Sequence, residues 1–434
     1  MVQKKVAIIG AGITGLQSAI ELADSGIEVY LIEKKIYAGG NASDLYKAFP
    51  TDDCFFCIGS TNKKKGIRKC FYRSGVIEHP NINLILNAEI EDILNNDNKH
   101  VLVLNQKPQY IDVDKCIQCG VCETSCPILL KENENLLKIE FEKPIFKKIQ
   151  CLPYSYYLKR EFCKEGCNEC EKACPVEGAI NLNAKETSKK IEVDAILGSL
   201  GYREFKPTEI KNYHYGDFLN VITQLELARM LDPTGPTEGK LIRLSDKAPA
   251  KRILMIQCIG SRDEKYYAYC SSTCCSFANK HAKIIKLERY NDSQVWLVYR
   301  DIRTLGINEK LYKETRQAGV NFVKGQVSKI SQEEDGTLSI LLFDLILNRF
   351  IELKIDLLVL SCALIPGDYG IKISNLLNFQ LNKFNFIDSQ VNLVQTQKNG
   401  IFITGSMLKP ITLEESTTLA RASAFHIIKF LTTV

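Results

Sequence analysis

Residues 6–15 read "VAIIGAGITG", a short apolar run that continues into Gly-x-Gly-x-x-Gly at Gly10, Gly12 and Gly15. The run predicts a buried strand, and the apolar spacing over residues 14–26 predicts a helix that ends at a glycine. In such a turn the first glycine bends the chain, the second admits a pyrophosphate, and the third lets helix and strand pack closely. The helix N-terminus would offer its free N–H groups to the phosphates. This stretch therefore predicts a dinucleotide site.

The residues after this helix indicate which dinucleotide is bound. Glu33 ends a second predicted strand, 18 residues beyond Gly15, where a carboxylate can bind a ribose 2′-hydroxyl. Gly39 and Gly40 follow, a pair typical of FAD rather than NAD enzymes. Near the end of the chain, "GIFITGS" predicts a strand up to Gly405 and then a helix whose N-terminus faces the flavin ring. The predicted FAD-binding residues are Gly10, Gly12, Ile13, Thr14, Gly15, Glu33, Lys34, Gly39, Gly40, Asn41, Gly201, Gly405, Ser406 and Thr412.

Composition limits the class of protein. The 434 residues are 45% hydrophobic, enough for two or three packed domains, and the net charge of +5 forms no stripe of the kind that binds nucleic acid. No window approaches ~18 uninterrupted apolar residues, so no membrane span is expected. The 17 cysteines are not preceded by a signal-peptide pattern. We therefore expect a reducing, cytoplasmic location, where thiols bind metal or do redox chemistry.

Two cysteine runs predict an inserted iron–sulfur domain. "CIQCGVCETSCP" at 116–127 has the C-x2-C-x2-C-x3-C-P spacing of bacterial ferredoxins, and "CKEGCNECEKACP" at 163–175 repeats it with one extra residue in the first interval. In that pattern the fourth cysteine of each run ligates the other cluster. The alternatives are zinc sites or free thiols. The predicted ligands are Cys116, Cys119, Cys122 and Cys174 for one [4Fe-4S] cluster, and Cys163, Cys167, Cys170 and Cys126 for the other.

A third cysteine group follows the strand "RILMIQ", where a flavin reductase with two dinucleotide-binding domains would carry its second glycine loop. Here "QCIGSRDEKYYAYCSSTCC" at 257–275 lacks that loop, so it offers no cradle for a nicotinamide pyrophosphate. It offers four thiols instead, as ligands of a third cluster or as buried core residues. These cysteines are Cys258, Cys270, Cys274 and Cys275.

The predicted fold class is α/β: a flavoprotein with two dinucleotide-binding domains, a Rossmann-like FAD domain, and an inserted 2×[4Fe-4S] ferredoxin domain. The predicted domains are the first part of the FAD domain at 1–108, the ferredoxin-like insert at 109–185, the FAD domain continuation at 186–250, a degenerate NAD(P)H-like domain carrying a cluster at 251–350, and the C-terminal part of the FAD domain at 351–434.

Several segments together resemble the A subunit of heterodisulfide reductase, and also the related A subunit of quinone-interacting membrane-bound oxidoreductase. They include "FPTDDCFFC", "LNVITQLELARML", "GPTEGKLIRLSD", "QCIGSRDE", "YCSSTCC" and "DIRTLG", and they occur in the family's order over nearly the whole chain. The resemblance implies FAD, an inserted two-cluster domain, and an unusual cluster near the flavin held by the third cysteine group. It also implies a homodimer that docks onto other electron-transfer subunits of heterodisulfide reductase type.

The chain departs from the family at several points. It lacks the extra cluster-bearing regions at both ends of long methanogen-type members, and it keeps insert cysteines that quinone-type members mostly lose. Cys362-Ala363 replaces the usual Thr-Gly, and Ser406 stands where cysteine is common. Some family members split an electron pair at the flavin, a process called bifurcation, and these departures leave that property open here.

Other candidate residues carry open alternatives. The resemblance implies that Lys280 stabilises reduced, anionic flavin, and the alternative is an exposed helix lysine. His281 is expected at the surface or hydrogen-bonded by a neighbour, Cys362 is expected in the core, and the sequence offers no paired carboxylates to propose for acid–base catalysis. Cys54 and Cys57 are a redox disulfide, inert packing residues, or ligands of an extra cluster. Their partners in that cluster would be Cys70 and either Cys151 or a thiol from another polypeptide.

Three functional hypotheses follow. The first is an oxidoreductase subunit that passes electrons between FAD, clusters and partner subunits, with the terminal substrate on another subunit. The second is a self-contained NAD(P)H-dependent FAD oxidoreductase, with the quinone-interacting type as a further alternative. The third is an assembly module that only stores clusters, and the FAD site argues against it.

Overall fold

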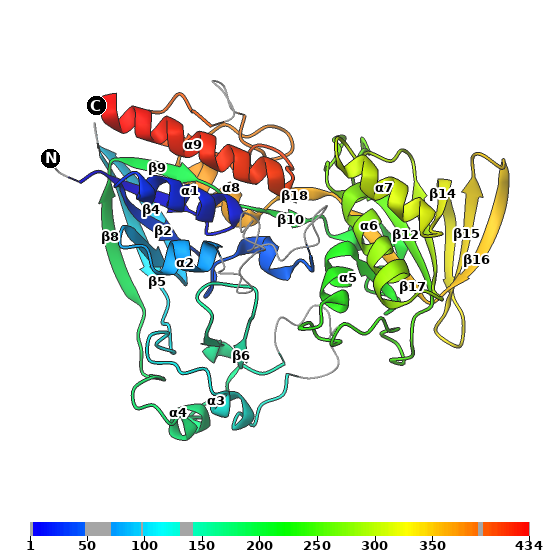
Figure 1. The fold of residues 1–434 in the computed structure, drawn as a ribbon, viewed down its shortest axis with the longest axis horizontal. Helices are drawn as coiled ribbons and strands as arrows, with labels where there is room; N and C mark the ends of the chain where they lie inside the picture. The colour runs from blue at the N-terminus through cyan, green and yellow to red at the C-terminus, as the bar shows by residue number, and fades with distance from the viewer. Residues whose placement is uncertain (1–2, 48–70, 97–98, 131–141, 389–393, 434) are drawn as a thin grey trace, which may run out of the picture.

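The computed structural model describes residues 3–47, 71–96, 99–130, 142–388 and 394–433. Two α/β lobes stand side by side, and a small domain rich in loops hangs below the lobe that contains the N-terminus (Figure 1). Strand β10 (Tyr202–Glu204) pairs antiparallel with β18 (Leu364–Pro366) and joins the lobes. The chain therefore crosses between the lobes in both directions at one place.

The first lobe is built on five parallel strands in the order β19-β9-β1-β2-β3. Helices α1 (Ile13–Asp24) and α9 (Leu413–Thr433) pack together on one face of this sheet, and α2 (Phe71–Ile77) lies beside α1 (Figure 1). The predicted apolar stripe of α1, from Leu16 to Ala23, is buried because it faces this sheet and α9. The strands are β1 (Lys5–Ile9), β2 (Glu28–Ile32), β3 (Ile82–Ile85), β9 (Ala195–Gly198) and β19 (Ile401–Ile403).

A second, antiparallel sheet covers the other face of the parallel sheet. It contains β4 (Ala88–Asn96), β5 (Lys99–Gln106) and β8 (Thr187–Val193), with α8 (Asp368–Leu376) against β4. The chain changes sheets at Asp194, between β8 and β9, where the Asp194 carboxylate accepts a hydrogen bond from the backbone N–H of Lys5 at 2.7 Å. Residues on either side of this anchor therefore join different sheets.

The small domain leaves the second sheet after β5 and returns to it at β8. It contains α3 (Val121–Thr124), β6 (Ile145–Lys147), β7 (Tyr156–Leu158) and α4 (Glu169–Ala173). Its core is small and consists largely of cysteine, with Cys122 and Cys170 buried among a few aliphatic and aromatic side chains. A domain with so little apolar surface to bury depends on other cross-links for its stability.

The second lobe contains a seven-stranded sheet in the order β11-β17-β12-β13-β14-β15-β16, parallel up to β14 and antiparallel beyond it. Helix α6 continues into a π-helical turn at Ile284–Arg289. The strands are β11 (Val221–Thr223), β12 (Arg252–Ile259), β13 (Gln294–Tyr299), β14 (Asn321–Gln332), β15 (Leu338–Asp344), β16 (Arg349–Ile355) and β17 (Leu357–Cys362), and the helices are α5 (Gln224–Leu231), α6 (Cys274–Lys283) and α7 (Asn308–Gln317).

Strand β19 ends two residues before the predicted Gly405. A short 3-10 turn, Gly405–Met407, separates it from α9. In the described ranges, no helix combines the length and the apolarity needed to span a bilayer.

Candidate functional site

The glycine turn between β1 and α1 has the predicted geometry. Gly10 adopts φ +104°, a conformation that side chains with a Cβ rarely adopt. A Cβ on Gly15 would lie 1.9 Å from the Gly10 carbonyl oxygen, so only glycine lets the helix pack this close to the strand. At Gly12 a Cβ would meet only Gly40 Cα, at 3.9 Å, so this position is open toward the cavity. Gly15 therefore allows the close packing of α1 on β1, and Gly12 leaves room for a ligand in the cavity.

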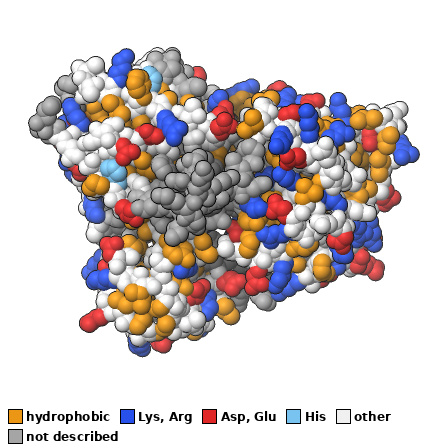
Figure 2. Space-filling model, viewed as in Figure 1, with side chains coloured by type: hydrophobic (Ala, Val, Ile, Leu, Met, Phe, Trp, Pro, Cys, Tyr) orange, Lys and Arg blue, Asp and Glu red, His pale blue; other side chains and the backbone are white. Residues whose placement is uncertain are grey.

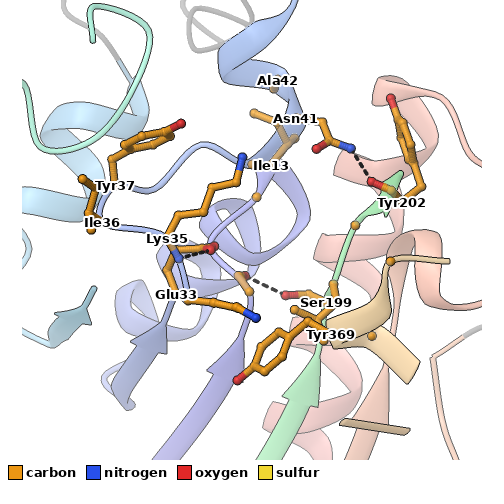
Figure 3. A pocket seen from close by; sticks show the side chains of 18 of the residues that line it. Ile13, Glu33, Lys35, Ile36, Tyr37, Asn41, Ala42, Ser199, Tyr202 and Tyr369 are labelled. Carbon is orange, nitrogen blue, oxygen red and sulfur yellow. Dashed lines mark hydrogen bonds between the residues drawn. The ribbon is translucent and has the colours of Figure 1, made fainter. Parts of the chain in front are cut away.

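The turn opens into a cavity of about 680 Å³ (Figure 3). Ten of the predicted cofactor residues line it: Gly10, Gly12, Ile13, Thr14, Glu33, Lys34, Gly40, Asn41, Gly201 and Ser406. The other four lie behind the wall. Gly15 packs against Gly10, Gly39 donates its N–H to the Ala11 carbonyl at 2.8 Å, Gly405 contacts Thr14, and the Thr412 hydroxyl accepts from the Glu415 N–H at the start of α9.

Glu33 closes the adenosine end of the predicted site. Its carboxylate accepts the N–H of Ala11 at 2.8 Å. It also accepts the N–H of Lys35 at 2.9 Å (Figure 3). Burial raises the pKa of Glu33, while these two N–H donors act in the opposite direction. The glycine turn and the acidic strand end are therefore held together as one rigid unit.

The opposite wall comes from segments far away in the sequence. The Asn41 amide donates to the Tyr202 carbonyl at 2.7 Å, and the Ser199 hydroxyl donates to the Gly10 carbonyl at 2.9 Å (Figure 3). Thr273 and Phe277 also line this cavity, and they belong to the second lobe, at the start of α6. Sequence reasoning missed both residues. The one signal available was their position beside the third cysteine group.

The insert brings its cysteines together in the crossed arrangement that the spacing predicts. One small cavity is lined by Cys116, Cys119, Cys122 and Cys174. Burial, followed by neighbouring thiols that include Cys116 and Cys119, raises the pKa of Cys122 to about 12. Burial and then the thiols Cys163, Cys126 and Cys167 raise the pKa of Cys170 to about 11. Cys126 therefore lies with the second run and Cys174 with the first.

The third cysteine group is assembled between the end of β12 and the start of α6. Burial raises the pKa of the Cys274 thiol well above its ordinary value, and Cys275, Cys258 and Cys270 raise it further. The four thiols are therefore within electrostatic range of one another. The Cys274 Sγ is 3.5 Å from the Cys362 carbonyl oxygen, and the Ser272 N–H donates to the Cys270 Sγ at 3.4 Å.

Arg262 and Arg300 lie close enough to the third cysteine group to affect its thiols. The guanidinium of Arg262 lies at Cys258 and opposes the rise in the thiol's pKa that burial causes, and Arg300 acts in the same direction from further away. Cys275 lies against the loop after β13, where its Sγ is 3.8 Å from the Asp301 carbonyl oxygen and accepts the Arg303 N–H. The first residues of α6 are Cys274 and Cys275, so the helix N-terminus also favours their thiolate forms. These residues suit an anionic thiolate cluster.

Lys280 is fully buried, so the alternative of an exposed helix lysine is wrong. Its ammonium donates to the carbonyls of Tyr46 and Lys47 at 2.9 Å each, and it is not among the residues that line the cavity. The role of Lys280 toward the flavin stays a prediction. His281 is also fully buried, not at the surface, and its Nδ1 lies 2.6 Å from Gln224 Oε1. Burial holds the pKa of His281 well below its usual value.

Two carboxyl groups that are distant in the sequence lie close to each other near the third cysteine group. The Thr223 hydroxyl donates to Glu204 at 2.7 Å, and the Thr223 N–H donates to Glu226 at 2.7 Å. Burial raises the pKa of Glu204 to about 7, and the charge of Glu226 adds to this effect. Glu204 also raises the pKa of the Cys274 thiol, and both carboxyl groups raise the pKa of the Cys362 thiol.

The remaining cysteines divide into two groups. Cys54, Cys57 and Cys70 lie outside the described residues, so their alternatives stay open. Cys151 is buried beside Tyr37 and Tyr157, and Cys362 is buried in the core of the second lobe, as expected. Apart from Cys151, the described cysteines are free thiols, and in this part of the chain no three His, Cys, Asp or Glu side chains could hold a single metal ion.

Comparisons with known proteins agree with this arrangement. The family model for FAD-dependent oxidoreductases matches residues 5–46, and that for 4Fe-4S binding domains matches residues 110–128. Thioredoxin reductase from Lactococcus lactis shares the fold with a TM-score of 0.52 at 11% identity, over the whole of both chains.

Curated relatives extend the similarity to nearly the whole chain. The iron-sulfur A subunit of the CoB–CoM heterodisulfide reductase of Methanocaldococcus jannaschii is 36% identical over 98% of this chain and 64% of its own length. The A subunit of the H2:CoB-CoM heterodisulfide, ferredoxin reductase of Methanothermobacter thermautotrophicus is 33% identical over 98% and 63%. The chain thus spans a little under two thirds of the length of these relatives, and over that shared region it is similar to the A subunits of heterodisulfide reductases.

Proposed function

We propose that the chain is an electron-transfer subunit of a heterodisulfide reductase-like complex, with FAD and three [4Fe-4S] clusters as its cofactors. Electrons would pass between the flavin, the cluster at Cys258–Cys275, the two insert clusters and partner subunits. The reduction of a terminal substrate would take place on another subunit. The proposal places the complex in the cytoplasm, because iron–sulfur clusters and free thiols persist in a reducing compartment.

One observation carries this proposal: a single cavity is lined both by the glycine turn of the first lobe and by Thr273 and Phe277 of the second. Thr273 directly precedes Cys274 in the chain. A dinucleotide bound along this cavity would therefore end beside the third cysteine group. In a reductase that uses a nicotinamide, this part of the second lobe would instead carry a phosphate-binding loop.

The residues present fit these cofactors. The α1 N-terminus and the open Gly12 position suit a diphosphate, and Glu33 suits a ribose. Bound FAD would supply the exchange between two-electron and one-electron chemistry, which clusters alone do not provide. Around the third group, Arg262 and the N-terminus of α6 favour thiolates, and the N–H of Ser272 stabilises the Cys270 sulfur.

The insert suits a connection to other subunits. Figure 2 shows hydrophobic side chains gathered over this domain, at the lower left of the view. Ile117 and Leu129 are among its exposed hydrophobic residues, and each is close in sequence to a predicted cluster ligand. The printed names of the relatives describe subunits, which supports further subunits as partners here. A homodimer and bifurcation at the flavin belong to the same proposal and rest on the family resemblance.

The test is anaerobic purification with cofactor analysis. The proposal expects one FAD and about twelve iron atoms per chain, since three four-iron clusters are assigned. Fewer than about eight iron atoms with FAD bound would contradict it. Rapid bleaching of the flavin by NADH or NADPH without partners would favour the self-contained oxidoreductase instead, and reduction by a quinol would favour the quinone-interacting type.

A further inference from the structure

One edge of the second lobe exposes apolar side chains directly above the third cysteine group. The loop at 300–307, between β13 and α7, carries Leu305 and Ile307 with 80% and 65% of their surfaces exposed. The loop is held in place from beneath. The Arg262 guanidinium pairs with Asp301 at 2.7 Å, and Arg300 donates to the Arg262 carbonyl at 2.8 Å.

The turn between β15 and β16 extends this apolar surface. Tyr299, the last residue of β13, pairs with Lys324 of β14, and the Leu345 N–H donates to the Lys324 carbonyl at 2.9 Å. The turn therefore lies at the same end of the sheet as the loop. Its Leu345, Ile346 and Leu347 are all more than half exposed. We name this surface the β13 edge: Arg300, Arg303, Leu305, Ile307, Lys324 and Leu345–Leu347.

The charge of the β13 edge is positive. Arg300, Arg303 and Lys324 are exposed. Asp301, the acid among them, is paired with Arg262, and the cations Arg262, Lys324 and Arg303 hold its pKa below the usual value. Apolar residues rimmed by cations complement the acidic surface of a partner protein.

The β13 edge also gives short access to the proposed cluster ligands. The Arg303 N–H is bonded to the Cys275 sulfur, and the Asp301 carbonyl oxygen lies 3.8 Å from it. Two residues thus separate exposed Leu305 from a predicted ligand. A surface that only joined structural subunits would not need a thiol directly beneath it.

From this arrangement we infer that the β13 edge docks a small acidic one-electron carrier protein, and that the cysteine group beneath it is the port through which the carrier exchanges electrons with the chain. This inference rests on the proposed function. One electron moves per encounter: the reduced carrier is oxidised by one electron, the iron–sulfur group held by the four cysteines is reduced by one, and no bond is made or broken.

The test uses the full chain, loaded with FAD and clusters, and an acidic bacterial [4Fe-4S] ferredoxin as probe. Binding of the oxidised probe is measured by biolayer interferometry, and electron transfer from the reduced probe by stopped-flow absorbance. We expect Arg303→Glu to weaken binding and to slow transfer at least ~10-fold at low salt, and the difference to vanish at high ionic strength. We expect Leu305→Ser/Ile307→Ser to weaken binding at both salt concentrations, because the lost contact is apolar.

Matched controls separate docking from damage. Phe425→Ser and Lys429→Glu alter an exposed aromatic residue and an exposed cation on α9, and they should leave probe binding unchanged. Dithionite should reduce every variant at the wild-type rate, and the iron content should stay constant.

Unchanged probe binding by both β13-edge variants would overturn the inference, and so would a change in their oligomeric state, which would show that a second copy of the chain covers this surface. A wild-type chain without the third cluster would instead overturn the proposed function.

Discussion

Each lobe places a strand, a turn and a helix at the same position in a parallel sheet, and the two turns differ completely. In the first lobe β1 leads to α1 through three residues, two of them glycine. In the second lobe β12 leads to α6 through fourteen residues, with four cysteines at or near their ends. Both helix N-termini point at the predicted cofactor. Under the proposed function, the same position in this architecture binds a diphosphate in one lobe and a cluster in the other, according to the turn it carries.

The two turns also bend by different means. The short turn relies on Gly10, and a side chain at Gly15 is excluded by the packing of α1 on β1. The long turn has positive φ angles at Arg262 and Ser272, and so does Cys258 just before it in β12; none of the three is glycine. These positions cost more conformational energy than glycine would. Cluster ligation would help to hold the long turn in this conformation.

The largest effect is expected in the short turn. Gly15→Ala places a methyl group against the Gly10 carbonyl, which should cost about 3 kcal/mol or more and lower the Tm by roughly 6–12 °C, with loss of FAD. Gly12→Ala is the matched control, because it should fold normally and bind FAD more weakly. Thermal unfolding and FAD absorbance measure both. A Gly15→Ala protein with normal Tm and FAD would show that this turn does not depend on close packing.

The cluster proposed at the long turn should not be required for the fold. Cys274→Ser should remove about four of about twelve iron atoms, because one cluster loses a ligand, and it should leave FAD and the insert iron in place. Cys362→Ala is the control, since Cys362 lies beside Cys274 without being a predicted ligand, and it should keep all iron. Iron analysis and EPR measure the outcome. If the Cys274→Ser protein lost all of its iron, the third cluster would not be independent of the insert clusters.

The carboxyl pair beneath the long turn should make stability depend on pH. The pKa of Glu204 is raised to about 7 in the folded chain, above the ordinary value of 4.5, so the folded state holds a proton that the unfolded state releases. The free energy of unfolding should therefore fall as pH rises from about 4.5 to about 7. Above pH 7 the stabilisation from the Glu204 proton is absent, and this group causes no further change. Between pH 5.5 and 8 we expect the Tm to fall by a few degrees more in wild type than in Glu204→Gln. Glu238→Gln, at an exposed site, should behave like wild type.

The smallest effect concerns the potential of the third cluster. Arg262→Gln removes the cation at Cys258, so the reduced state, which carries more negative charge, should be less favoured. We expect the reduction potential to fall on the order of 50 mV, about a tenfold change in the one-electron equilibrium. Arg316→Gln on α7 should leave it unchanged. EPR-monitored redox titration checks this. A rise in potential would show that the loss of the guanidinium is outweighed by new solvent access.

Local patterns predicted much of this molecule. The glycine turn and the apolar stripe of α1 follow from short spacings, because each lies within one turn or one helix. The crossed grouping of Cys126 and Cys174 follows from the spacing within each of two similar runs. The five predicted domain ranges stay predictions.

Long-range contacts could not be predicted in this way. Glu204 and Glu226 come from β10 and α5 and meet only because Thr223 bonds to both. Lys280 is charged and lies on a helix, which suggests exposure, yet the carbonyls of Tyr46 and Lys47 from the other lobe satisfy it in the interior. Such contacts depend on how the lobes pack, which no local spacing encodes.

The way the insert is attached has its own consequence. Gln106 and Thr187, where β5 ends and β8 begins, face each other in antiparallel register. To the sheet, the whole inserted domain is an enlarged hairpin loop, so its length can change without disturbing the pairing on either side. Such an attachment lets the inserted domain be exchanged as a unit. Ancestors of this chain could have gained, lost or replaced this domain while the first lobe kept its shape.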